Sequence, residues 1–250
     1  MNVRIAIQVV LSGLFLSSFQ SSSFGQSHDT SLAIPPDNHY MDPNNQGVSL
    51  IKNEKYEEAN HFFSAEIKKD EANRSAYFNR GVVNWNMNNE ANACRDWSAL
   101  LALGDTAAFK LLDKNCHGEM VIEEDTIKSS QYHKMWEGRK NDKAATAPAM
   151  SIVDEMPQYP GGSDSLMNYI ADHLRYPKHA AEKKIQGRVY VNFIISSKGK
   201  ILFPYIARGI SKECNAEAIR LVKSMALWKP GRQSGKAVPV RYSLPVTFSL

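Results

Sequence analysis

One interval constrains the first half of this 250-residue chain more than any other feature of the sequence. Four kinds of residue recur 34 positions apart: a glycine, a valine, an alanine and a large aromatic residue. The pairs are Gly47 and Gly81, Val48 and Val82, Ala59 and Ala93, and Phe63 and Trp97. Small residues let two helices cross closely, because a larger side chain would hold them apart, and an aromatic ring fills the gap to the next repeat. The interval therefore predicts a repeated helical hairpin.

Both the period and its residues resemble the tetratricopeptide repeat, a helix-turn-helix unit of 34 residues. Gly47, Ala59 and Phe63 match the first unit, and Tyr77, Gly81, Ala93 and Trp97 match the second. We expect helical repeats with a capping helix over 44–117. Two units are fewer than a stable solenoid usually has, and the proline expected near each unit's end is absent. The resemblance implies a peptide-binding surface, and a structural spacer is an equal alternative.

Three cysteines restrict the redox chemistry. Cys94 and Cys116 lie 22 residues apart, each on a predicted helix, and a bridge between them would stabilise the fold by roughly 3 kcal/mol. Cys214 is left over in the second half of the chain. The alternative is three buried free thiols. With no CxxC and no Cys/His pair at zinc-finger spacing, we predict neither a metal site nor a cofactor.

The first residues have the pattern of a targeting segment. Met1–Arg4 is positive, Ile5–Phe19 is apolar, and cleavage is predicted after Gly25, so that 1–25 form a signal peptide. An uncleaved signal anchor is the alternative. Either reading predicts export, which permits disulfides. No apolar run reaches the ~20 residues that a spanning helix needs, which excludes a polytopic membrane protein.

Charge is divided between two parts of the chain. Residues 26–151 hold 14 Lys and Arg against 19 Asp and Glu, whereas residues 152–250 hold 15 against 7. The total of +4 is too mild to favour nucleic acid as a partner. The split predicts two modules with different surfaces, or simply two solvated faces. Between them, 118–151 is polar and weakly periodic, which predicts a linker with one short element around Tyr132–Trp136.

The second module, 152–250, predicts an α+β fold with two helices and a three-stranded antiparallel sheet. The expected elements are a helix capped by Ser163, a strand over Val189–Ile195, a turn over Ser196–Gly199, a returning strand over Ile201–Ala207, a helix capped by Asn215, a turn over Trp228–Gly231 and a last strand over Val240–Leu250. The last strand alternates strictly between apolar and other residues, which is typical of a half-buried strand.

Several spaced motifs of this module resemble the TonB C-terminal domain. They are Val153-x-Glu155-x-Pro157-x-Tyr159-Pro160-Gly161-Gly162, Tyr176-Pro177-x-x-Ala180, Gly187-x-Val189-x-Val191-x-Phe193, Gly199, Glu217-Ala218, Trp228-x-Pro230-Gly231 and Leu244-Pro245-Val246-x-Phe248. The resemblance covers about 152–250, some 40% of the chain. We expect Trp228 to be a core residue. For Tyr176, a role in the core and a direct contact with a ligand are equal alternatives.

This resemblance implies that the domain binds the TonB box, a short extended segment of an outer-membrane transporter, by β-strand addition beside its last strand. The implied contact residues are Arg175, Tyr176, Pro177, Val240, Arg241, Tyr242, Ser243, Leu244, Val246 and Phe248. Pro245 cannot donate to a ladder, so we expect it at an edge or a bulge. Lys236 and Arg241 are candidate partners for acidic receptor segments.

The leading hypothesis is therefore a periplasmic TonB-like protein for energy-coupled transport, anchored in the inner membrane if 1–25 is not cleaved. Inner-membrane motor proteins are a further partner that the resemblance suggests. The alternative is a periplasmic scaffold in which the helical repeats bind and the TonB-like domain does not transduce energy. No HExxH or GxSxG motif is present, and we predict no enzymatic activity. The sequence does not specify the receptor, its cargo or the oligomeric state.

Overall fold

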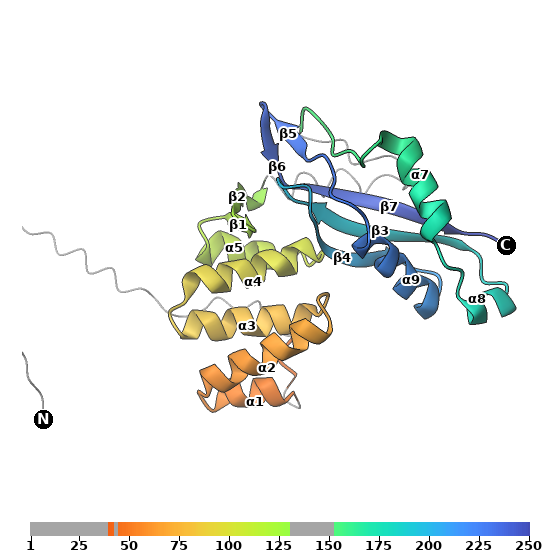
Figure 1. Ribbon diagram of the computed structural model, residues 1–250. Coiled ribbons are helices and arrows are strands. Elements are labelled where there is room, and N and C mark those ends of the chain that lie inside the picture. Colours follow the sequence, from red (N-terminus) through yellow and green to blue (C-terminus); the bar gives the residue numbers. More distant parts are fainter. Residues whose placement is uncertain (1–39, 43–44, 131–152) are drawn as a thin grey trace, which may run out of the picture. The chain divides into compact units, whose positions relative to one another are not determined.

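The computed structural model describes residues 40–42, 45–130 and 153–250 (Figure 1). All of them belong to one compact unit, Leu32–Leu250. The predicted signal peptide, most of the predicted linker and the element expected around Tyr132–Trp136 lie outside the described residues. No helix of the described part of the chain is both long and apolar enough to cross a membrane.

Helical hairpins form the first region, as the 34-residue interval predicts. The helices are α1 (Gln46–Lys52), α2 (Tyr56–Lys69), α3 (Arg74–Asn86), α4 (Glu90–Ala102) and α5 (Ala108–Asn115). Asparagine side chains start three of these helices by accepting hydrogen bonds from backbone N–H groups of the first turn. Asn45 caps α1, Asn73 caps α3 and Asn89 caps α4.

Each glycine of the repeat lies against the aromatic residue that follows it by 16 positions. A Cβ atom on Gly47 would overlap the ring of Phe63, and one on Gly81 would overlap the indole of Trp97. The close crossing of helices that the small residues predicted is confirmed. Each ring thus packs within its own hairpin, and it also belongs to a cluster with the following helix: Phe63 with Ala76 and Val83 of α3, and Trp97 with Leu111 of α5. Trp97 is fully buried, which makes it a centre of this core.

The predicted linker is ordered at its beginning, contrary to expectation. β1 (Glu119–Ile122) and β2 (Asp125–Lys128) form an antiparallel hairpin. Met120 and Ile122 alternate into the core beside α4, which supplies the apolar burial that a polar linker would lack.

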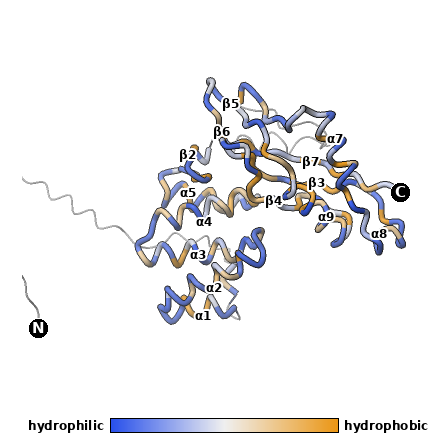
Figure 2. Tube along the Cα trace, in the orientation of Figure 1, coloured by the Kyte–Doolittle hydropathy of each residue, from blue (hydrophilic) through white to orange (hydrophobic). Residues whose placement is uncertain are grey.

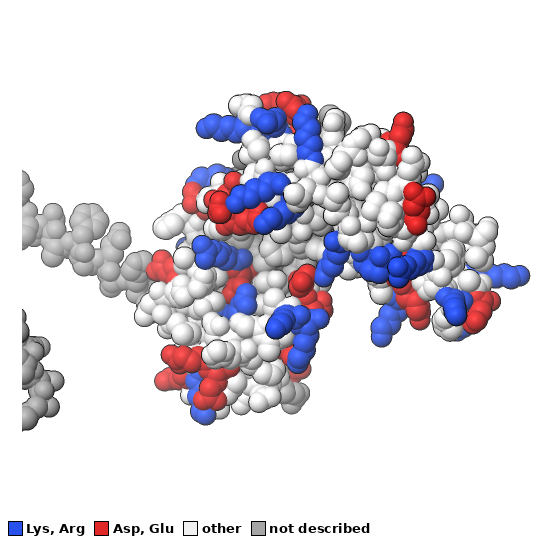
Figure 3. Space-filling model, in the orientation of Figure 1, with Lys and Arg blue, Asp and Glu red and all other residues white. Residues whose placement is uncertain are grey.

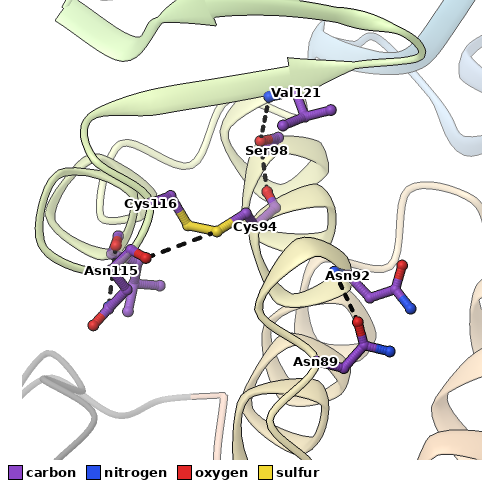
Figure 4. Close-up of a disulfide and its surroundings, with 8 residues drawn as sticks. Asn89, Asn92, Cys94, Ser98, Asn115, Cys116 and Val121 are labelled. Carbon is purple, nitrogen blue, oxygen red and sulfur yellow. Dashed lines mark hydrogen bonds between the residues drawn. A yellow bond between two sulfur atoms is a disulfide. The ribbon is translucent and has the colours of Figure 1, made fainter. Parts of the chain in front are cut away.

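A disulfide joins Cys94 of α4 to Cys116 at the end of α5, directly before this hairpin (Figure 4). Ser98 adds a second tie: its hydroxyl donates to the Cys94 carbonyl at 2.6 Å and accepts from the Val121 N–H at 2.8 Å. The hairpin is therefore held to α4 by both a covalent bond and a hydrogen-bonded serine. Cys214 is a buried free thiol.

The C-terminal region has the predicted α+β fold. Its elements are α7 (Gly162–His173), α8 (Lys178–Glu182), β3 (Gly187–Ile195), β4 (Ile201–Arg208), α9 (Lys212–Lys223), β5 (Gly231–Gln233), β6 (Lys236–Val238) and β7 (Val240–Phe248). The main antiparallel sheet has the order β4-β3-β7, and β5 and β6 form a separate hairpin that the sequence analysis missed.

Two predicted helix caps were wrong. α7 begins at Gly162, because Gly161 takes the cap position with a φ of 81°. α9 is capped by Ser211, whose side chain accepts from the Cys214 N–H, while Asn215 accepts from the Ile210 N–H outside the helix. In both cases the chain enters the helix earlier than its first apolar residues indicated.

An aromatic cluster around Trp228 forms one end of the core between the sheet and its helices. Trp228 is 3% exposed, and its ring lies 4.9–6.0 Å from those of Tyr159, Phe193 and Tyr242, measured between centroids. The expected core role of Trp228 is confirmed. Figure 2 shows hydrophobic colour along much of β3 and β4.

The helical region contacts the opposite face of the same sheet. The rings of Tyr77 and Phe203 meet edge to face at 6.3 Å, and a Cβ on Gly104 would overlap the hydroxyl end of Tyr205. Ile194 and Val240 belong to the same hydrophobic cluster as α4 and α5. The two regions therefore share a core.

Charged groups reinforce this contact at the β1–β2 turn. Glu123 pairs with Lys200 at 3.1 Å and Glu124 pairs with Lys198 at 2.9 Å. Ser197 donates a hydrogen bond to Asp125. Figure 3 shows acidic and basic side chains interspersed over the visible face. Part of the opposite charge of the two modules is thus paired within the chain.

Candidate functional site

β7 is an edge strand with a regular backbone. It pairs with β3 through nine successive residue pairs, from Val240 opposite Ile195 to Phe248 opposite Gly187, without a register shift. Among the described residues, no strand pairs with its outer side. The other edge, β4, has two register shifts against β3, and it contains Pro204 and a positive φ of 52° at Phe203. β7 is therefore the better template for an added strand.

Pro245 indicates which backbone groups of β7 point outward. It lies at an edge, as predicted, and the ladder passes it without a bulge. Proline has no N–H, so an unbroken ladder requires its nitrogen to face away from β3. Backbone groups alternate between the two sides of a strand, so those of Arg241, Ser243 and Thr247 face outward as well. The outer edge then presents the N–H groups of Ser243 and Thr247 and a gap at Pro245.

The predicted contact residues of β7 differ in burial. Val240, Leu244, Val246 and Phe248 are buried, so these side chains belong to the core and only their backbone lies near the edge. Ser243 and Tyr242 are half-buried. Burial raises the pKa of the Tyr242 hydroxyl.

The two cations expected to meet acidic receptor segments differ in position. Arg241 is 5% exposed, and its guanidinium donates a hydrogen bond to the hydroxyl of Tyr205. The guanidinium also lies over the ring of Tyr205, 5.7 Å from the ring centroid, as in a cation–π contact. Its burial between the sheet and the helical region makes it a structural residue, contrary to the expectation for an exposed contact. Lys236 on β6 is exposed.

The segment Arg175-Tyr176-Pro177 lies at the far end of β7. The ring of Tyr176 meets Phe248 edge to face at 5.7 Å, and its hydroxyl donates to the Ile185 carbonyl at 2.6 Å. Tyr176 therefore packs against the core and fixes the end of the strand. The side chain of Arg175 is exposed, so it is the member of this segment most available to a partner.

A buried carboxylate holds that segment in place. Glu217 of α9 accepts a hydrogen bond from the Arg175 N–H at 2.7 Å and is paired with Arg220 at 2.7 Å. The hydrogen bond from the Arg220 guanidinium is the main reason why the pKa of Glu217 lies below its ordinary value. The Glu217-Ala218 motif of the sequence thus acts in positioning Arg175.

A pocket of about 150 Å³ lies beside Tyr242, and the sequence analysis did not identify it. It is formed by the segment before α7, the first turns of that helix, the aromatic cluster and β7. Its lining residues are Pro157, Gln158, Tyr159, Gly162, Ser163, Leu166, Trp228 and Tyr242. The motif from Pro157 to Gly162 contains four of these residues, but it was used above only as part of the family resemblance.

A second, polar pocket between α2, α3 and α4 is occupied by its own hydrogen-bond network. Arg80 pairs with the buried Asp96 at 2.6 Å, and Asn84 donates to Asp96 at 2.9 Å. The charges of this pocket are therefore satisfied within the helical region. Among the described residues, no cluster of three or more His, Cys, Asp or Glu could hold a metal ion.

Residues 172–250 match the model of the family described as Gram-negative bacterial TonB protein C-terminal. None of the curated proteins matches the chain.

Two solved structures are similar to part of the chain, both NMR solution structures of the Helicobacter pylori TonB C-terminal domain. The longer fragment is 28% identical, covering 36% of this chain and 86% of that one, with a TM-score of 0.28. The shorter is 24% identical, covering 34% and 90% respectively, with a TM-score of 0.29.

Proposed function

We propose, from the premise that residues 172–250 form a TonB C-terminal domain, that this protein binds outer-membrane transporters by adding a segment of the transporter to β7. The family is associated with the cell envelope and with transport, and its domains are non-enzymatic binding domains that interact with outer-membrane transporters. The observation that carries the proposal is the regular outer side of β7, with which no strand of the described residues pairs.

The two edges of the sheet support the choice of strand. Phe203 and Tyr205 of β4 pack against Tyr77 and Gly104 of the helical region, so this part of β4 is in contact with protein. An extended peptide at β7 would pair with the outward backbone groups of the strand, and this pairing supplies affinity without demanding a particular sequence.

Export and energy coupling follow as further parts of the proposal. Residues 1–25 would direct the chain across the inner membrane, either as a cleaved signal peptide that leaves a periplasmic protein or as an anchor. An anchored form would engage inner-membrane motor proteins itself, whereas a cleaved form would act as an adaptor. The intact mass of the native protein distinguishes the two, because cleavage after Gly25 removes a defined segment.

Photo-crosslinking in living cells tests the partner. A p-benzoylphenylalanine at Thr247, which is exposed beside the outer edge, should form adducts that mass spectrometry identifies as outer-membrane transporters. The same residue at Lys110, exposed on α5, is the control and should give no transporter adduct. Adducts with transporters from Lys110 alone would place the contact on the helical region and overturn the proposal.

Backbone substitutions test the mode of binding. Ser243→Pro removes one outward N–H and should strongly reduce the Thr247 adducts, whereas Ser243→Ala keeps the N–H and should not. Pro245→Ala adds an outward N–H and should increase them. Equal adduct yields in all three variants would exclude strand addition at β7. Deletion of 240–250 is not a clean test, because Leu244, Val246 and Phe248 are core residues.

A further inference from the structure

The lining of the pocket beside Tyr242 indicates that it lies toward the outer side of β7. Tyr242 contributes to its lining, but no residue of the neighbouring strand β3 does, although Phe193 is the direct partner of Tyr242 in the ladder. The ring of Trp228 packs against those of Phe193 and Tyr242, and it separates the pocket from Phe193. The pocket is therefore continuous with the edge at which an added strand would lie.

The position of the pocket fixes which residue of an added strand would reach it. Side chains directly opposite each other in neighbouring strands lie on the same face of a sheet, about 5 Å apart. The residue opposite Tyr242 would therefore project toward α7 and away from the helical hairpins. Its side chain would meet the pocket between Tyr242 and Ser163.

α7 presents an exposed apolar residue along the same path. Tyr169 of this helix bonds to Ser224, just beyond α9, which marks the flank of α7 that faces α9. Successive helical residues turn by about 100°, so Met167 lies on the other flank, toward the outer side of β7. Met167 is 65% exposed, and only Leu227 and Leu250 are comparably exposed among the large apolar side chains of the described residues.

Helix and strand distances match along this flank. Ser163 and Met167 are four helical residues apart, or about 6 Å along the axis. Two strand residues span about 6.8 Å. A strand whose residue opposite Tyr242 meets Ser163 would therefore place the residue opposite Leu244 near Met167.

We infer that this surface selects the sequence of the added strand: the pocket takes a large apolar or aromatic side chain opposite Tyr242, and Met167 contacts a second apolar side chain two residues away. Tyr159, Trp228, Tyr242 and Leu166 supply apolar and aromatic walls, and Gln158 and Ser163 form the polar rim. This inference rests on the proposed function, since it specifies the side chains that the transporter segment would carry.

A phage-displayed library of random nine-residue peptides, selected on the full-length protein, tests the inference. Bound peptides should be enriched in Phe, Tyr, Trp, Leu or Met at two positions separated by one residue. Ser163→Phe fills the pocket and should lower the affinity of a selected peptide roughly tenfold or more. Replacing the pocket side chain of that peptide by Ala should abolish the difference between this variant and the wild type.

Matched variants on the same helix exclude general damage. Asp164→Phe adds the same ring one position further, outside the pocket lining, and should leave affinity unchanged. Met167→Glu should weaken binding, whereas Asn168→Glu should not. If peptides bind in a Ser243→Pro-sensitive manner but show no large side chain at either position, the selection is overturned and strand addition stands. If Ser243→Pro has no effect on any selected peptide, strand addition itself fails.

Discussion

The helical region and the C-terminal domain each centre on a tryptophan that packs against a glycine, yet they assemble these contacts differently. In the helices, Trp97 meets Gly81, its neighbour by 16 positions within one hairpin. In the domain, the Trp228 carbonyl occupies the space where Gly199 would carry a Cβ, and its ring meets Tyr159 from far earlier in the chain. The first core repeats a local interval, whereas the second combines segments that are distant in sequence.

This difference explains what each region contributes to function. A local, repeated core can be stable without any open edge, because every helix satisfies its backbone internally. A three-stranded sheet necessarily has two edges, and here one edge meets the helical region while the other remains available in the part of the chain described. The helical region thus packs against one edge of the sheet, and the proposed site lies at the other.

The largest expected effect tests whether the two cores are independent. Trp97→Ala should lower the free energy of unfolding by about 3–5 kcal/mol, because the indole is fully buried. Since the hydrophobic cluster of Trp97 also includes Tyr205, we expect one cooperative transition that shifts as a whole in thermal unfolding followed by circular dichroism. Trp85→Ala, at a half-buried position, is the control with a smaller shift. Two transitions, with only one displaced, would show that the regions unfold separately.

The core of the helical region was easier to predict from the sequence than the core of the C-terminal domain, because its contacts recur at a local interval. The 34-residue interval predicted close helix crossings at Gly47 and Gly81, because glycine recurs with the repeat, but it did not predict that the rings of Phe63 and Trp97 lie against these glycines. The alternation of β7 predicted the strand and its buried face. The β1–β2 hairpin was missed since four-residue strands carry little periodicity. The pocket beside Tyr242 was missed because it is lined by segments whose approach depends on the completed fold, and the burial of Arg241 depends on contacts across the two regions.

Removal of the disulfide tests the local character of the helical core. The Cys94→Ala/Cys116→Ala variant opens a loop of 22 residues and should lose about 3 kcal/mol of stability. Dithiothreitol should lower the melting temperature of the wild-type protein to about that of the double variant, and it should not change the melting temperature of the variant. An unchanged melting temperature in the double variant would mean that Ser98 and the packing of α5 hold the hairpin alone. Cys214→Ala, which leaves the bond intact, should keep the response to reductant.

The buried ion pair of the helical region provides a test by pH. Burial raises the pKa of Asp96 despite its hydrogen bonds from Arg80 and Asn84. Arg80→Met leaves this carboxylate without its cation and should lower the free energy of unfolding by about 2–3 kcal/mol at pH 7. This loss is smaller than that expected for a fully buried ion pair, because Arg80 is partly exposed. A native pKa above the unfolded value means that the folded state binds a proton first, so the deficit relative to wild type should shrink as pH falls through that pKa.

Urea unfolding of both proteins between pH 4 and 7 measures this deficit. Arg95→Met removes an exposed neighbouring cation and should cost little at any pH. A deficit for Arg80→Met that stays constant over the range would show that the loss comes from packing of the arginine side chain and not from the charge of Asp96.

The smallest effect decides what the division of charge along the chain means. Glu123–Lys200 and Glu124–Lys198 link the two regions, but their lysines are about half exposed. The Glu123–Lys200 pair should therefore contribute no more than about 0.5–1 kcal/mol, and less in high salt. A double-mutant cycle with Glu123→Gln and Lys200→Gln should give a coupling energy of that size at low ionic strength. The Lys128–Glu119 pair, which lies within the hairpin, supplies a matched cycle that does not cross between regions.

Coupling across the regions together with faster amide exchange at Phe203 in Lys200→Gln would show that the charges help to hold the sheet against the helices. Zero coupling would reduce the division of charge to two solvated faces, and the shared apolar core alone would then account for the contact that leaves β7 as the open edge.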